Sequence, residues 1–122
     1  MAAPNLVNVT SIYGKTMGAA LGTNVNATLL TCASDKVLKI NSIIVANVDG
    51  TNSADVTVKF YDSSATTSYT LGATIAVPAD STLIILGKDS PIYLEESDEI
   101  RGGASATSDL EITISYEELD DA

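Results

Sequence analysis

Residues 110–117 (LEITISYE) alternate apolar and polar side chains without a break. A period of two places one set of side chains on one face of a β-strand and the other set on the opposite face. The same alternation occurs at 55–61 (DVTVKFY) and at 69–77 (YTLGATIAV), where it places Tyr69 on the apolar, buried side. No window has the spacing of an amphipathic helix, so these three stretches predict an all-β protein.

Two further stretches have apolar side chains on both faces. Residues 37–48 (VLKINSIIVANV) form a long predicted strand, and 82–86 (TLIIL) a shorter one. Within the long strand one parity is almost entirely apolar, and we expect it to face the core. Its members are Leu38, Ile40, Ile44, Ala46 and Val48. A two-sided strand is either central in the fold or meets another subunit with its second face. Residues 5–13, 25–32 and 99–104 are expected to be edge strands.

Turn-forming residues separate these strands at intervals of about ten residues, a spacing typical of sandwiches and barrels. Asp49-Gly50 predicts a hairpin after the long strand, and 62–67 a polar loop. Eight or nine alternating strands are best buried as two packed sheets. We therefore predict a single antiparallel β-sandwich of about eight strands, jelly-roll or immunoglobulin-like, over residues 1–122. Residues 1–7 would form an N-terminal arm and 117–122 an acidic tail.

The charge balance excludes several classes of protein. The chain of 122 residues has 6 Lys+Arg against 16 Asp+Glu, a formal net charge of −10. Nucleic-acid binding requires clustered cations, so we expect neither nucleic acid nor an anionic membrane as a partner. The first residues, MAAPNLV, lack the basic start and apolar run of a signal peptide, and no run of eighteen apolar residues predicts a membrane span.

The side chains of most catalytic and metal sites are scarce. The sequence contains no histidine, and Cys32 is its one cysteine, which we expect to be a buried structural thiol. Carboxylates gather at 95–99 and 117–121, a grouping also found in glycosidases and calcium sites. Neither group has the spacing of an EF-hand loop, and we interpret them as a solvated turn and a tail. We expect no enzyme activity, no cofactor and no metal.

Two features indicate contact with other chains. The small, apolar arm at 1–7 can lie along a neighbouring subunit and add a strand to its sheet, although a disordered terminus fits equally well. The two-sided strands can present apolar side chains to a subunit contact, although burial beneath a loop also accounts for them. The candidate contact residues are Pro4, Asn5, Leu6, Val7, Ile43, Val45 and Ile84.

Three stretches resemble a known family. They are 3–16 (APNLVNVTSIYGKT), 44–58 (IVANVDGTNSADVTV), and 92–101 (IYLEESDEIR) through 115–119 (SYEEL). Together they resemble small virion structural proteins of tailed phages, especially marine phages of cyanobacteria. In the turn that precedes the closing strands, this chain has Ser97 where the pattern has glycine, which changes the turn.

The resemblance implies a capsid decoration (cement) protein. Such a protein is made in the host cytoplasm and binds the outer surface of the virion, where it contacts the major capsid protein and stabilises the shell. It is a homo-oligomer, with a trimer favoured. A tail, neck or baseplate component would have the same fold and composition. A carbohydrate-binding module, with Tyr13, Tyr61 and Tyr93 as its exposed aromatics, is a further alternative, and a glycosidase comes last.

Overall fold

The computed structural model describes residues 6, 7 and 9–120. These residues form nine strands and no helix. The strands are β1 (Ser11–Ala20), β2 (Thr28–Thr31), β3 (Lys36–Asn47), β4 (Ala54–Asp62), β5 (Thr67–Val77), β6 (Thr82–Leu86), β7 (Ile92–Leu94), β8 (Glu99–Ala104) and β9 (Leu110–Asp120). All strand pairs are antiparallel.

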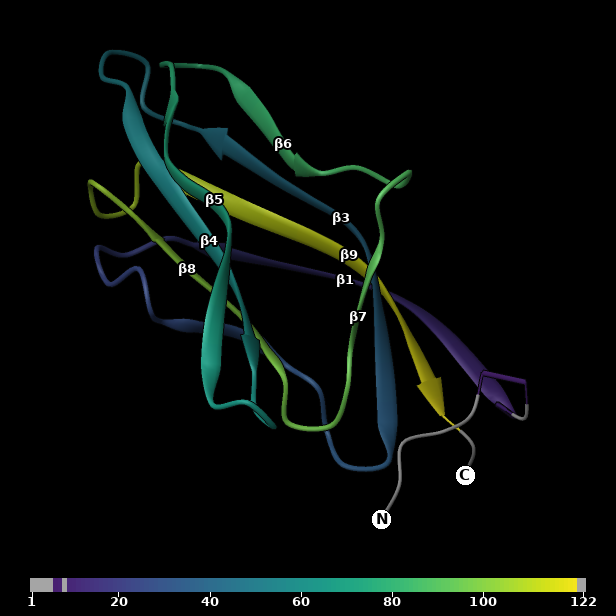
Figure 1. The fold of residues 1–122 in the computed structure, drawn as a ribbon. Coiled ribbons are helices and arrows are strands. Elements are labelled where there is room, and N and C mark those ends of the chain that lie inside the picture. Colours follow the sequence, from purple (N-terminus) through teal and green to yellow (C-terminus); the bar gives the residue numbers. More distant parts are fainter. Residues whose placement is uncertain (1–5, 8, 121–122) are drawn as a thin grey trace.

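The strands form two sheets that pack face to face (Figure 1). Sheet A has five strands in the order β1-β9-β3-β6, and β7 also pairs with β3, on the residues that β6 leaves unpaired. Sheet B has four strands in the order β2-β8-β4-β5. The predicted all-β antiparallel sandwich is therefore confirmed, with nine strands in place of about eight.

The core lies between the sheets and consists mainly of branched aliphatic side chains. Sheet A contributes Ile112 and Ile114, and sheet B contributes Val56, Val58 and Ile100, all fully buried. Burial of one such side chain stabilises the fold by roughly 1.5–3 kcal/mol. The alternations at 55–61 and 110–117 thus face the core as predicted, because a strand's period of two depends only on local backbone geometry.

A β-bulge in β3 reverses the face that its side chains meet. Ile40 pairs with Tyr116 and Ser42 pairs with Ser115. β3 therefore has one extra residue between two positions that are consecutive in β9. Such an insertion exchanges the inner and outer faces of the rest of the strand. Leu38 and Ile40 face the core before the bulge. The predicted parity is wrong after it, since Ile43, Val45 and Asn47 are buried there instead.

Several predicted boundaries and connections also differ. The strand expected at 5–13 is β1, which begins at Ser11 and extends to Ala20. The predicted edge strand at 99–104 is β8, which is central because β2 and β4 flank it. The turn at Asp49 is no hairpin, since it joins β3 of sheet A to β4 of sheet B. Tyr69 is 54% exposed, because β5 is an edge strand of sheet B.

The predicted acidic tail is largely a strand. β9 continues to Asp120, and Glu117 and Glu118 lie within it between β1 and β3. The run of polar side chains at 117–120 predicts a tail, but Lys15 and Lys36 on the neighbouring strands form ion pairs with Glu118 and Asp120. Residues 121 and 122 lie outside the described part of the chain.

Gly102 and Gly103 allow a loop to pack closely over β8. A Cβ atom on Gly103 would lie 2.5 Å from the backbone oxygen of Asn24. The same loop is bonded to β8 at both ends, because Gly102 N donates to Ala27 O at 3.0 Å and Ala104 N donates to Gly22 O at 2.8 Å. These glycines are therefore needed for the close approach of two backbone segments.

Candidate interaction surface

The outer face of sheet A is the surface directed away from the core. Its side chains are the neighbours in sequence of buried ones: Thr113 lies between Ile112 and Ile114, and Ile44 between Ile43 and Val45. The pairing registers place Gly18, Thr113, Ile44 and Ile84 in one row across four strands. Ile84 is 66% exposed at the end of this row. Because Ile44 lies beside it in the same row, Ile84 belongs to an apolar pair on this face, which makes the row a candidate contact.

The rows on either side of this one are small and mostly uncharged. One contains Ala20, Glu111, Ala46 and Thr82, and the other Thr16, Ser115 and Ser42. On β1 this face carries the small residues Gly18 and Ala20. A shallow open depression lies there, beside Glu111 and Thr113. These rows therefore have few large side chains and one shallow depression, so another surface can approach them closely.

The remaining rows complete the outer face. Gly14, Glu117, Lys39 and Tyr93 form one row, and Ile12, Leu119 and Val37 form the last. Leu119 and Val37 are buried although they do not belong to the core between the sheets, whereas Ile12 and Tyr93 are exposed. Two glutamates and one lysine are thus the charged side chains of the whole outer face, in a chain of net charge −10.

The opposite surface, on sheet B, is polar and internally paired. Glu99 Oε1 lies 2.8 Å from Arg101 Nε and also accepts a 2.7 Å hydrogen bond from the hydroxyl of Thr28. The bond from Arg101 holds the pKa of the Glu99 carboxyl below its usual value. The Arg101 guanidinium in turn lies 3.7 Å from the ring centroid of Tyr61. The charges of Glu99 and Arg101 are therefore paired with one another.

The tyrosines proposed for sugar binding do not gather. One face of the Tyr61 ring is occupied by the Arg101 guanidinium. Tyr93 belongs to the outer face of sheet A, whereas Tyr13 has the opposite parity on that sheet, opposite Glu118. A carbohydrate platform needs neighbouring aromatic faces open to the ligand, and the described tyrosines lie on three separate surfaces.

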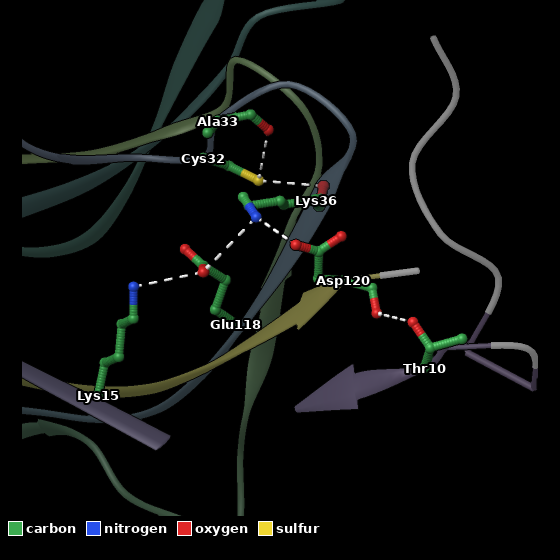
Figure 2. Close-up of polar contacts among 7 residues, drawn as sticks. All are labelled: Thr10, Lys15, Cys32, Ala33, Lys36, Glu118 and Asp120. Atoms are coloured by element: carbon green, nitrogen blue, oxygen red, sulfur yellow. Dashed lines mark hydrogen bonds and ion pairs between the residues drawn. The ribbon is translucent and has the colours of Figure 1, made fainter. Parts of the chain in front are cut away.

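A cluster of ion pairs lies where sheet A extends past the core. Lys15 Nζ is 3.3 Å and Lys36 Nζ is 3.8 Å from Glu118 Oε1, and Lys36 also contacts Asp120 (Figure 2). The hydrogen bond to Asp120 raises the pKa of the Lys36 ammonium. This cluster connects β1, β3 and β9, so its role is to hold the ends of three strands together.

Cys32 is buried beside this cluster. Its Sγ donates a 3.2 Å hydrogen bond to the backbone oxygen of Lys36 (Figure 2). Burial, together with nearby carboxylates, raises the pKa of the Cys32 thiol to about 11. The thiol is therefore protonated at neutral pH and a poor nucleophile, as a structural cysteine would be.

The two predicted carboxylate clusters are used within the fold. Asp98 is only 3% exposed and accepts hydrogen bonds from the backbone of Ser63 and of Glu95, each at 3.0 Å. In the group at 117–121, Glu118 and Asp120 form ion pairs with Lys15 and Lys36. Over residues 6, 7 and 9–120, no three carboxylates or thiols converge as metal ligands would.

The candidate contact residues fall into three groups. Pro4 and Asn5 lie outside the described residues, whereas Leu6 and Val7 are described and exposed. Ile43 and Val45 are fully buried in the core, so their assignment to a surface contact is wrong. The β-bulge is the reason, because it turns both side chains inward. Ile84 alone lies exposed on a sheet face.

Sequence reasoning missed Ile44, Ile12 and Tyr93 as members of this surface. The bulge interrupts the alternation around Ile44, and Tyr93 lies in a strand of only 3 residues, whereas Ile12 lies near the start of β1. The pairing registers bring all three onto one face. The two-sided apolar stretch at 43–45 was the one signal, and it pointed to the correct strand.

The chain matches no known protein family, and a search among curated proteins finds no significant relative. Among the described residues, none of the secondary structure is a helix that could cross a membrane.

Proposed function

We propose that the protein is a structural component of a phage virion, a capsid decoration protein that contacts the major capsid protein through the outer face of sheet A. The observation that carries this proposal is the row of Ile44 and exposed Ile84 on a flat, nearly uncharged face. Removing such a face from water costs little polar desolvation and gains apolar burial. Contact surfaces have this character more often than solvated ones do.

The remaining surface suits a crowded shell. A chain of net charge −10 repels free nucleic acid and other anionic particles, so we expect neither nucleic acid nor a membrane among its partners. The resemblance of 44–58 and 92–101 to virion proteins supports the same role, and it implies synthesis in the host cytoplasm and a location on the outside of the virion. It also favours a homotrimer, which stays a prediction.

The mechanism is mass action on the assembled shell. A protein that binds the assembled lattice, and not its free subunits, stabilises that lattice by its own binding free energy. Many copies, each in contact with neighbouring capsid subunits, would together oppose the pressure of packaged DNA. No catalytic step is part of the proposal.

Localisation tests the proposal directly. Purified protein is mixed with particles that lack it, and the mixture is imaged by cryo-electron microscopy. Density over the capsid lattice is the expected result. Density confined to the tail, neck or baseplate would replace the proposal with the alternative virion role, and a bare particle would overturn both.

A charge substitution tests the surface. Ile84→Glu places a carboxylate at the exposed end of the apolar row, and we expect at least a tenfold loss of particle binding in co-sedimentation, about 1.4 kcal/mol. Thr70→Glu is the matched control, because Thr70 is exposed on β5 of the other sheet. Equal binding by the two variants would show that sheet A does not make the contact.

A further inference from the structure

The open side of β1 differs from the other sheet edges. β2, β6 and β7 have only 4, 5 and 3 residues. β5 is longer, but its pairing with β4 is interrupted by two register shifts. β1 has 10 residues paired with β9 in unbroken register. Figure 1 shows the two strands side by side. Short strands and bulges protect a sheet edge from pairing with another chain, and β1 has neither protection.

The free backbone groups of β1 follow from its register. Leu21 N donates to Leu110 O at 2.9 Å, which fixes the odd-numbered residues of β1 as those bonded to β9. The even-numbered residues direct their N–H and C=O groups to the open side. In the described part of the chain no strand pairs with them there. The residues whose backbone groups point to the open side are Ile12, Gly14, Thr16, Gly18 and Ala20.

The charge of β1 also permits a second copy to approach. The remainder of the chain is strongly acidic, yet residues 11–20 contain no carboxylate and no proline. Lys15 is the charged residue of the strand, and it is neutralised by Glu118 at 3.3 Å. Two anionic molecules can therefore meet at this edge without a carboxylate on either of the two pairing strands.

We infer that β1 pairs antiparallel with β1 of a second copy about a twofold axis, which joins the two A sheets into one. Because the bonded residues are even-numbered, the twofold axis passes at a residue, and Lys15 and Thr16, the two central residues of β1, give the longest pairing. An axis at Lys15 would place two lysines directly opposite, which is destabilising. An axis at Thr16 pairs the two threonines and Gly14 with Gly18, and it places Lys15 opposite Met17. The register centred on Thr16 is therefore the favoured one.

This pairing does not depend on a capsid role. It would make the outer faces of two A sheets continuous, and it is isologous, so it closes as a dimer. The trimer implied by the resemblance would need a different contact. Particle binding and dimer formation can each fail without the other, since Ile84 lies at the far side of the sheet from β1.

Cross-linking of the full-length protein tests both the interface and its register. In a hydrogen-bonded antiparallel pair the facing Cα atoms are about 5.5 Å apart, within disulfide range. Thr16→Cys is therefore expected to form a disulfide-linked dimer under mild oxidation. Ala20→Cys is the matched control, since in this register it faces Ile12 and should stay monomeric. Cys32 is buried in both variants.

Two further measurements need no substitution. Light scattering after size exclusion should give twice the monomer mass of 12.6 kDa at high concentration. Amide exchange should slow with concentration at Thr16 and Gly18 but not at the odd-numbered residues already bonded to β9. A monomeric or trimeric mass, or equal cross-linking at positions 16 and 20, would overturn the inference.

Discussion

The Asp98 side chain joins the turn between β7 and β8 to the hairpin between β4 and β5 by accepting two hydrogen bonds from Ser63, a 3.0 Å bond from its backbone N–H and a 3.2 Å bond from its hydroxyl. The other carboxylate oxygen of Asp98 accepts from Glu95 N at 3.0 Å. A polar side chain with this many partners at 3% exposure fixes the two loops together.

Replacing Asp98 should therefore weaken the fold substantially. Asp98→Ala leaves the Ser63 and Glu95 N–H groups without their partner, and we expect a loss of about 3 kcal/mol in the free energy of unfolding. Chemical denaturation monitored by circular dichroism measures it. Asp89→Ala, at an exposed site, should be near neutral. Similar stabilities for the two variants would mean that the Asp98 bonds contribute little.

Ser97 is strained and should be improved by glycine. Its φ of 72° lies in the left-handed region, where a side chain costs roughly 1–2 kcal/mol. Ser97→Gly removes that cost against a smaller entropic penalty, so we expect a gain of about 0.5–1 kcal/mol in stability. The thermal midpoint measures the change. Ser90→Gly, in another loop, should not stabilise. A lower midpoint for Ser97→Gly would contradict this account of the turn.

Gly103 should not tolerate even one added carbon. Gly103→Ala brings Cβ within 2.5 Å of Asn24 O, where backbone meets backbone and neither gives way easily. We expect a loss of about 1–3 kcal/mol in the free energy of unfolding. Gly87→Ala is the control, because no atom lies within 4 Å of its added Cβ. The comparison is made by denaturant titration, and equal midpoints would refute a tight contact over β8.

The Glu99–Arg101 pair should make stability depend on pH in a defined direction. The bond from Arg101 lowers the pKa of Glu99 in the folded state below its reference of 4.5. The stabilisation is therefore present above pH 4.5 and is lost as the pH falls through the folded-state pKa. Glu99→Gln should be less stable than the parent at pH 7, and the gap should close in acid.

Denaturation curves of both proteins from pH 7 to pH 3 measure this gap. The acidification also reduces the repulsion of the whole chain, but it does so almost equally in both proteins, so the difference isolates the pair. A gap that stays constant or widens in acid would contradict the assigned direction.

Much of the fold was readable from local pattern. Val56, Val58, Ile112 and Ile114 alternate with polar residues and all face the core, because the period of a strand is a property of its own backbone. The two-sheet sandwich followed from the number of such strands. The apolar character of both faces of its strand makes Ile84 a contact candidate; the structure shows that it is exposed, and the contact itself stays a prediction.

The pairing of strands that are far apart in sequence determined the remaining side-chain orientations. The inward turn of Ile43 and Val45 depends on the bulge opposite Tyr116 and Ser115, and a bulge is set by the register of two strands far apart in sequence. For the same reason Glu118 became a strand residue between Lys15 and Lys36, where the sequence alone suggested a tail.

The sequence by itself determined that this chain forms alternating strands, carries a strong negative charge and contains no histidine, since these are properties of composition and local periodicity. Only the tertiary structure decided which apolar side chains leave the core. Ile44 and Ile84 become neighbours on an outer face because β3 and β6 pair there, and β1 pairs with β9 on one side and with no other strand of the described residues. Both are consequences of long-range pairing, which no local pattern encodes.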